Sequence, residues 1–134
     1  MGLFVSLVFI EIVLCILYPA PHVFTQRDPI IGIVFKPGDS GWYSAGPDGL
    51  RHKVIINSKG LRDKEYSYSK PDATFRILII FDSMTTGLAV SREKLFTEVL
   101  EKKLNDIQNG NYEVINAGVP AISVEEVIVQ LLKT

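Results

Sequence analysis

Ser83 is the residue whose place in the sequence most clearly permits chemistry. With Asp82 it directly follows an apolar run, 75–81, that has the composition of a buried strand. Open α/β sheets place ligands and reactive groups just beyond the carboxyl ends of such strands. A serine hydroxyl there becomes a nucleophile once a base takes its proton. The alternative is that Asp82 and Ser83 only form a polar turn.

The segments around Ser83 predict a parallel sheet. Run 75–81 is apolar on both faces, as a central parallel strand must be. Ser91 can cap an amphipathic helix over 92–108, and 112–117 then predicts a second strand. The order strand, helix, strand is typical of the start of a doubly wound α/β domain.

A second polar loop follows the second predicted strand. It contains Asn116 and Gly118, and Ser123 then starts a capping box that predicts another helix. The α/β domain that we expect therefore covers 73–134. Buried parallel strands need neighbours on both edges, so we expect these residues to be the N-terminal part of a larger domain.

The two loops lie in segments that resemble a known family. Residues 77–87 and 112–120 resemble the first and second sequence blocks of the SGNH (GDSL-type) hydrolases, separated by the length of one helix. Residues 56–63 are similar to part of the extension in membrane-anchored, extracytoplasmic bacterial members. The resemblance covers essentially the whole chain and implies a three-layer, flavodoxin-like α/β fold.

The resemblance also implies roles for four residues. Ser83 would be the nucleophile of ester hydrolysis, and its backbone N–H would be one donor to the oxyanion. Gly118 would supply a second N–H, a role that suits a residue with no side chain beside the substrate carbonyl. Asp82 would anchor the turn without being the acid of the catalytic triad, and Asn116 would be a supporting residue.

The family pattern is incomplete in this chain. The third oxyanion donor, an Asn, and the closing Asp-x-x-His that supplies the base have no match within the 134 residues. Phe81 stands where the family has Gly, Met84 where an aromatic residue is usual, and Ala121 where another Gly is common. Phe81 would be strained if its φ were positive and would only add bulk otherwise. His52 is an alternative base that we do not expect to serve, because it lies in the extension.

The N-terminal segment is the clearest break in composition. Residues 3–20 are almost continuously apolar apart from one serine and Glu11, and a helix of that length rises about 27 Å, close to the thickness of a hydrocarbon core. We expect a single-pass transmembrane anchor over 1–21. A cleaved signal peptide is a weaker alternative because the segment lacks a basic start, and a lipid-modified Cys15 is weaker because the bulky Leu14 precedes it.

The resemblance to membrane-anchored, extracytoplasmic members implies that the C-terminal domain lies outside the cytoplasm. Charge counting alone favours the opposite orientation. No Lys or Arg precedes the apolar run, whereas Arg27 and Lys36 follow it. Long downstream domains often cross the membrane despite such a bias, so we expect the extracytoplasmic orientation.

Residues 22–72 predict an ordered extension between the anchor and the domain. Turn-forming Pro, Gly and Asp separate short apolar pieces, so we expect one or two short strands before residue 49. Run 51–57 predicts a further strand with Val54 and Ile56 on one face. Gly60 ends it and is expected to have a positive φ.

Composition excludes several other classes of protein. The 14 basic and 15 acidic residues are interspersed, so we expect no nucleic-acid partner. A single cysteine excludes an internal disulfide and a structural zinc cluster. The two histidines, His22 and His52, form no spaced set of metal ligands, and we expect neither a metal nor another cofactor.

Two functions stay open at this point. The first is a membrane-anchored serine ester hydrolase or O-acyl transferase acting on an acylated small molecule or glycan, such as an envelope polymer. The 134 residues by themselves are expected to be inactive because they lack the base. The second is a degenerate, non-catalytic SGNH-like domain that is tethered to a membrane and binds a glycan or a partner.

Overall fold

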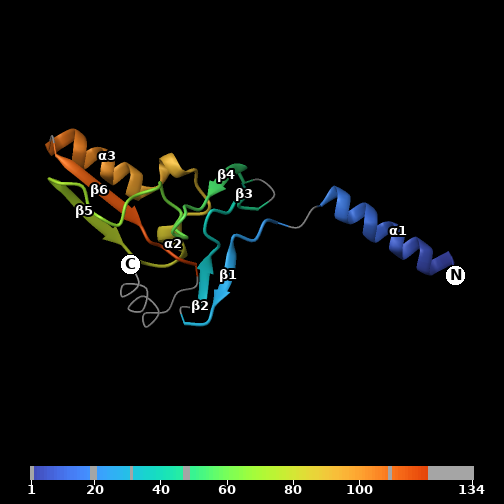
Figure 1. The fold of residues 1–134 in the computed structure, drawn as a ribbon. Helices are drawn as coiled ribbons and strands as arrows, with labels where there is room; N and C mark the ends of the chain where they lie inside the picture. The colour runs from blue at the N-terminus through green and yellow to red at the C-terminus, as the bar shows by residue number, and fades with distance from the viewer. Residues whose placement is uncertain (1, 19–20, 31, 47–48, 109, 121–134) are drawn as a thin grey trace.

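The protein is a mixed α/β chain in which one small sheet is parallel and two are antiparallel (Figure 1). The computed structural model describes residues 2–18, 21–30, 32–46, 49–108 and 110–120. The helix predicted from Ser123 and the position of Ala121 lie outside these residues.

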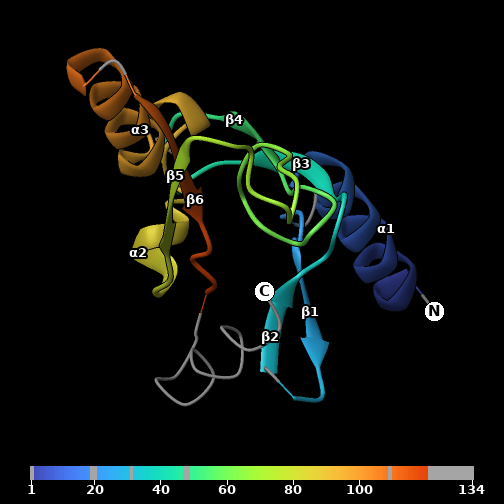
Figure 2. The ribbon, with the colours of Figure 1, turned by 60° about the vertical axis from the view of Figure 1, so that its left-hand side comes forward.

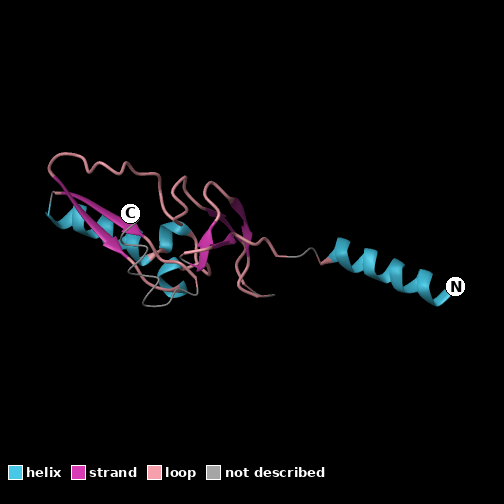
Figure 3. Ribbon diagram, turned by 60° about the horizontal axis from the view of Figure 1, so that its bottom comes forward, coloured by secondary structure: helices cyan, strands magenta, loops and turns pink. Residues whose placement is uncertain are grey.

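The predicted transmembrane anchor over 1–21 is not confirmed. The structure has a shorter helix there, α1 (Gly2–Leu17). It is 16 residues long and has no buried residue, and it stands apart from the sheets (Figures 1 and 3). Within the described ranges we find no helix with the length and apolar character needed to cross a membrane. The helix ends at Leu17, short of the predicted bound at residue 21, and Tyr18 is already outside it.

The extension folds into two hairpins, one strand more than expected before residue 49. Strand β1 (Thr25–Asp28) pairs with β2 (Gly32–Phe35), and β3 (Ser40–Tyr43) pairs with β4 (His52–Ile55). Their buried side chains form one cluster: Phe24, Phe35, Val54 and Ile56. The prediction that Val54 and Ile56 share a face is confirmed, since both are buried in this cluster.

A closed turn at 57–61 leads from the hairpins towards the parallel sheet. The Asn57 side chain accepts hydrogen bonds from the backbone N–H groups of Lys59 and Leu61, the arrangement that Asn favours in tight turns. Gly60 has φ +75°, which confirms the predicted positive φ. The turn delivers Arg62 and Asp63, both buried, to the end of the sheet.

The two strands of the predicted α/β domain pair in parallel. Strand β5 (Thr74–Ile79) runs beside β6 (Asn111–Asn116), with Thr74 opposite Asn111 and Ile79 opposite Asn116. Both strands end at the same edge, so the loops that follow them lie side by side. This confirms the parallel pairing that the helix between the strands requires.

The parallel sheet lies between two layers (Figure 2). Helix α3 (Phe96–Gln108) packs on one side, and the segment 57–68 of the extension covers the other. The predicted helix 92–108 is divided, because Arg92–Lys94 forms a 3-10 turn and Leu95 is extended. Ser91 makes no capping hydrogen bond with its side chain, contrary to its predicted role as helix cap.

Side chains occupy the outer edge of β6. The N–H of Tyr112 donates to Asn105 Oδ1 at 2.8 Å, and that of Val114 donates to Glu101 Oε2 at 2.7 Å. The N–H of Asn116 donates to Asp63 Oδ2 at 2.8 Å. These N–H groups are no longer available to a further strand. The side chains therefore block pairing at this edge of β6, as natural proteins commonly do at sheet edges.

Candidate active site

Ser83 lies on a single helical turn that begins directly after β5. Helix α2 (Ser83–Thr86) is capped by Asp82, whose Oδ1 accepts a hydrogen bond from Met84 N at 2.9 Å. Gly87 ends the turn with φ +63° and donates its N–H to the Ser83 carbonyl. The prediction that Asp82 anchors this turn is confirmed.

The first half of α2 faces solvent. Ser83 is exposed, and its neighbours Phe81 and Met84 are 61% and 82% exposed. Among the described residues only Ala73 is a non-glycine with positive φ. Phe81 is therefore not strained in place of the family's glycine and only adds apolar bulk beside the serine.

The second half of α2 is buried against the loop after β6. A Cβ placed on Gly118 would lie 2.5 Å from Thr86 N and 2.8 Å from Thr85 C, so only glycine fits there. Asn116 Nδ2 donates to the Thr85 carbonyl at 2.9 Å, and Asn116 is fully buried. The two loops predicted to form the site are thus in direct contact.

The backbone N–H of Gly118 does not face solvent. It donates to Asn116 Oδ1 at 3.0 Å, and Gly118 is buried. The next residue, Val119, donates its N–H to the Phe81 carbonyl at 3.0 Å. The predicted convergence of the Ser83 and Gly118 N–H groups on one oxyanion is therefore absent from this state, in which Asn116 holds the second donor.

Arg62, a residue of the extension, holds the C-terminal end of α2 by hydrogen bonds. Its guanidinium donates to the carbonyl oxygens of Thr86 (2.9 Å), Gly87 and Val90 (2.5 Å). The side chain is only 1% exposed, and this burial lowers the pKa of Arg62 to about 10. An arginine fork suits this task because it reaches several carbonyls at once.

Asp63 holds the start of the second loop. Its Oδ2 accepts the Asn116 N–H, and its Oδ1 accepts the Lys64 N–H at 2.7 Å. Burial raises the pKa of Asp63 to about 6, against the opposing effect of these two N–H groups. Arg62 and Asp63 are thus adjacent residues that fix the two loops separately.

Neither histidine of the chain is hydrogen-bonded to Ser83. His52 Nε2 lies 3.0 Å from the Leu88 carbonyl oxygen, and His22 Nε2 lies 3.0 Å from both carboxylate oxygens of Asp39. No cluster of potential metal ligands occurs in the part of the chain that the structure describes. Within the described residues, no histidine is therefore placed to act as the base for Ser83.

The structure thus brings together Asp82, Ser83, Asn116 and Gly118 at one edge of the sheet. Sequence reasoning missed the two residues that hold this edge, Arg62 and Asp63. The available signal was the segment 56–63, in which a charged pair follows a turn. The burial of Arg62 and Asp63 could not be predicted from the sequence, because it depends on how the segment 57–68 packs on the parallel sheet.

Comparison of the chain with protein-family models, with curated proteins and with solved structures found no match in any of the three.

Proposed function

We propose that this chain carries the nucleophile of an SGNH-type serine ester hydrolase, with Ser83 as the attacking residue. The observation that supports the proposal most is the position of Ser83. It is exposed on a capped turn directly after a parallel strand, beside the loop of the neighbouring strand. In this proposal β5 and β6 belong to a doubly wound sheet, and the substrate is an acylated small molecule or glycan.

The proposal requires two further steps. A histidine from outside residues 1–134 has to approach Ser83, since both histidines within them have other contacts. The Asn116 side chain has to release the Gly118 N–H, or another donor has to take its place. The first step concerns the exposed end of α2, whereas the second concerns the buried loop that packs against Thr85 and Thr86.

Active-site labelling tests the assignment of the nucleophile. We expect the native full-length protein to react covalently with a fluorophosphonate probe, and Ser83→Ala to abolish the reaction. Ser91→Ala is the matched control, because Ser91 also follows a turn near α2 but lacks the strand-end position. Equal labelling of Ser83→Ala and the wild type would disprove the role of Ser83.

A second candidate function is a non-catalytic binding domain. The engaged Gly118 N–H and the absence of a histidine contact at Ser83 favour it. It predicts that the native protein is not labelled at all, while it still retains an acylated glycan on a column. Labelling at Ser83 would exclude this candidate.

We further propose that α1 associates with a lipid bilayer and keeps the rest of the chain outside the cytoplasm. Large apolar side chains are exposed along the whole helix, from Leu3 and Phe4 to Ile16 and Leu17. In water such a surface is unfavourable, and a bilayer would cover it. Flotation with lipid vesicles should require residues 2–17, and a chain that floats equally well without them would contradict the proposal.

A further inference from the structure

The outer face of the β3–β4 hairpin is exposed and partly apolar. Ser40, Trp42, Lys53 and Ile55 alternate with less exposed residues along the two strands, so all four lie on this face. Trp42 is directly opposite Lys53, and Ser40 is opposite Ile55. The exposed fractions are 56% for Trp42 and 51% for Ile55. The outer face of an antiparallel pair is usually polar, so these two neighbouring apolar side chains call for a partner.

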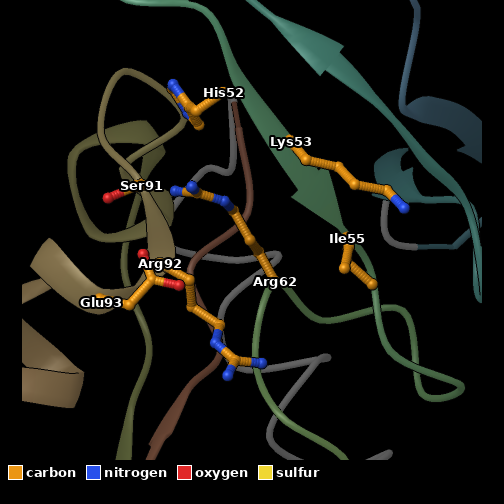
Figure 4. Close-up of a pocket in the computed structure, with 7 residues that line it drawn as sticks. All are labelled: His52, Lys53, Ile55, Arg62, Ser91, Arg92 and Glu93. Atoms are coloured by element: carbon orange, nitrogen blue, oxygen red, sulfur yellow. The ribbon is translucent and has the colours of Figure 1, made fainter.

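Two basic side chains accompany Trp42 on this hairpin. The guanidinium carbon of Arg51 is 5.2 Å from the centre of the Trp42 ring. Arg51 and Lys53 are exposed, and neither forms an ion pair with a described carboxylate. Figure 4 shows Lys53 extending away from Glu93, and Asp48, the only acidic residue of the hairpin, lies outside the described residues. The described part of the hairpin therefore carries two permanent positive charges and no negative one.

The segment that follows α1 is fixed to the same hairpin. His22 Nε2 lies 3.0 Å from both carboxylate oxygens of Asp39, just before β3. The His22 ring also lies against the backbone of β3, because a Cβ on Gly41 would be 2.7 Å from it. Lys36 Nζ donates a hydrogen bond to the Val23 carbonyl at 2.8 Å. The beginning of the extension is thus held against β3 by several contacts.

A cavity of about 550 Å³ lies where this segment meets the hairpin. Pro21 and His22 line it together with Trp42 and Arg51. Three peptide steps separate Pro21 from Tyr18, the residue after α1, so their Cα atoms are at most about 11 Å apart. If α1 lies in a bilayer, the hairpin is therefore held at the surface of that bilayer.

We propose that the exposed face of the β3–β4 hairpin lies on an anionic lipid surface, with Trp42 in the headgroup layer and Arg51 and Lys53 on the headgroups. Tryptophan favours this layer because its ring is apolar and its N–H is polar. The two unpaired cations are complementary to anionic lipids. The inference rests on the bilayer association proposed for α1 and adds a second contact, which sets the orientation of the extension on the membrane.

The fluorescence of Trp42 tests the proposal, because Trp42 is the only tryptophan of the chain. The full chain is reconstituted in vesicles of equal parts phosphatidylcholine and phosphatidylglycerol, with and without lipids that are brominated near the top of the acyl chain. Bromine quenches only a tryptophan close to it, so we expect most of the Trp42 emission to be lost. In vesicles of phosphatidylcholine alone, the ratio of quenched to unquenched protein should be roughly 20-fold lower, as two basic residues at the surface imply.

Three variants make the test specific to this face. Arg51→Gln and Lys53→Gln should each lower the ratio of quenched to unquenched protein about fivefold, the effect of one basic residue near an anionic surface. Each variant is compared with its own emission in vesicles without bromine, which removes any direct effect of the substitution on Trp42. Lys103→Gln is the matched control, because Lys103 is exposed on α3, outside the hairpin. It should leave the ratio unchanged.

The possible failures separate this proposal from the one made for α1. A chain that floats with the vesicles while Trp42 is not quenched would overturn the contact of the hairpin and leave the association of α1 intact. A chain that does not float would overturn both. Equal quenching in vesicles without phosphatidylglycerol would exclude an anionic partner. An equal effect of Lys103→Gln and of the hairpin variants would also overturn the proposal, because it would indicate general charge attraction.

Discussion

The two loops at the edge of the parallel sheet differ sharply in their surroundings. After β5, Phe81, Ser83 and Met84 face solvent. After β6, the residues from Asn116 to Val119 are buried, and the N–H groups of all four are hydrogen-bonded. One loop therefore exposes a hydroxyl group, whereas the other serves as the wall behind it.

The difference follows from the layer that covers each loop. The extension places Arg62 and Asp63 against the buried half of α2 and the start of the second loop. The exposed half of α2 is held by local bonds only, chiefly the Asp82 cap. In the proposed function, the buried loop would position the exposed Ser83. Five variants can separate the two parts.

Removing Arg62 should have the largest effect. Arg62→Met keeps most of the side-chain volume but leaves the carbonyls of Thr86, Gly87 and Val90 without their donor. We expect a loss of about 4 kcal/mol in the free energy of unfolding, at roughly 1–3 kcal/mol for each unsatisfied buried group. Urea unfolding followed by the fluorescence of the single tryptophan, Trp42, measures it.

The matched control for Arg62 is Arg27→Met. Arg27 is an exposed arginine of β1, and its replacement should change the free energy of unfolding by less than about 0.5 kcal/mol. Similar losses in the two variants would show that the Arg62 fork does not hold the loop.

The carboxyl of Asp63 should make stability fall as pH rises through its titration. Its pKa in the folded protein, about 6, exceeds the ordinary value of 3.8, so the folded state binds more protons between these values. The free energy of unfolding should therefore decrease by about 2 kcal/mol from pH 4 to pH 6. Asp63→Asn should remove this slope, and an unchanged slope in that variant would rule out Asp63 as its source.

Gly118→Ala tests how closely the wall approaches α2. Its Cβ would meet the backbone of Thr85 and Thr86 at 2.5–2.8 Å, which no side-chain movement can relieve. We expect a destabilisation of about 2 kcal/mol. Gly38→Ala serves as the control for strain without a close contact, since its φ is +73° but the space around it is open, and it should cost only about 1 kcal/mol. An equal cost for both glycines would mean that the close contact is not rigid.

The exposed half of α2 should tolerate substitution best. Asp82→Ala removes the cap and should cost about 1 kcal/mol in the free energy of unfolding. Ser83→Ala should change it by less than about 0.5 kcal/mol, because the hydroxyl is exposed. Thermal unfolding of both variants checks the difference. A large loss in Ser83→Ala would give Ser83 a structural role and weaken its assignment as nucleophile.

Much of the local structure could be predicted from residue type and spacing. The apolar runs at 75–81 and 112–117 indicated the two strands, and the helix-length segment between them indicated parallel pairing. The positive φ of Gly60 and the cap at Asp82 were also predictable, because both depend on near neighbours in the chain. The bounds of α1 and α3 were less well predicted, because helix ends depend on packing and capping.

The sequence by itself determined the strands, their direction and the place of Ser83 at the end of one of them. Only the tertiary structure decided that Asn116 binds the Gly118 N–H, that Phe81 is unstrained, and that Arg62 and Asp63 are buried. The physical reason is the separation along the chain over which each kind of interaction acts. Propensity and periodicity act over a few residues, whereas Asp63 meets Asn116 across 53 positions of the chain. Such contacts depend on how the layers pack, and packing is a property of the whole fold.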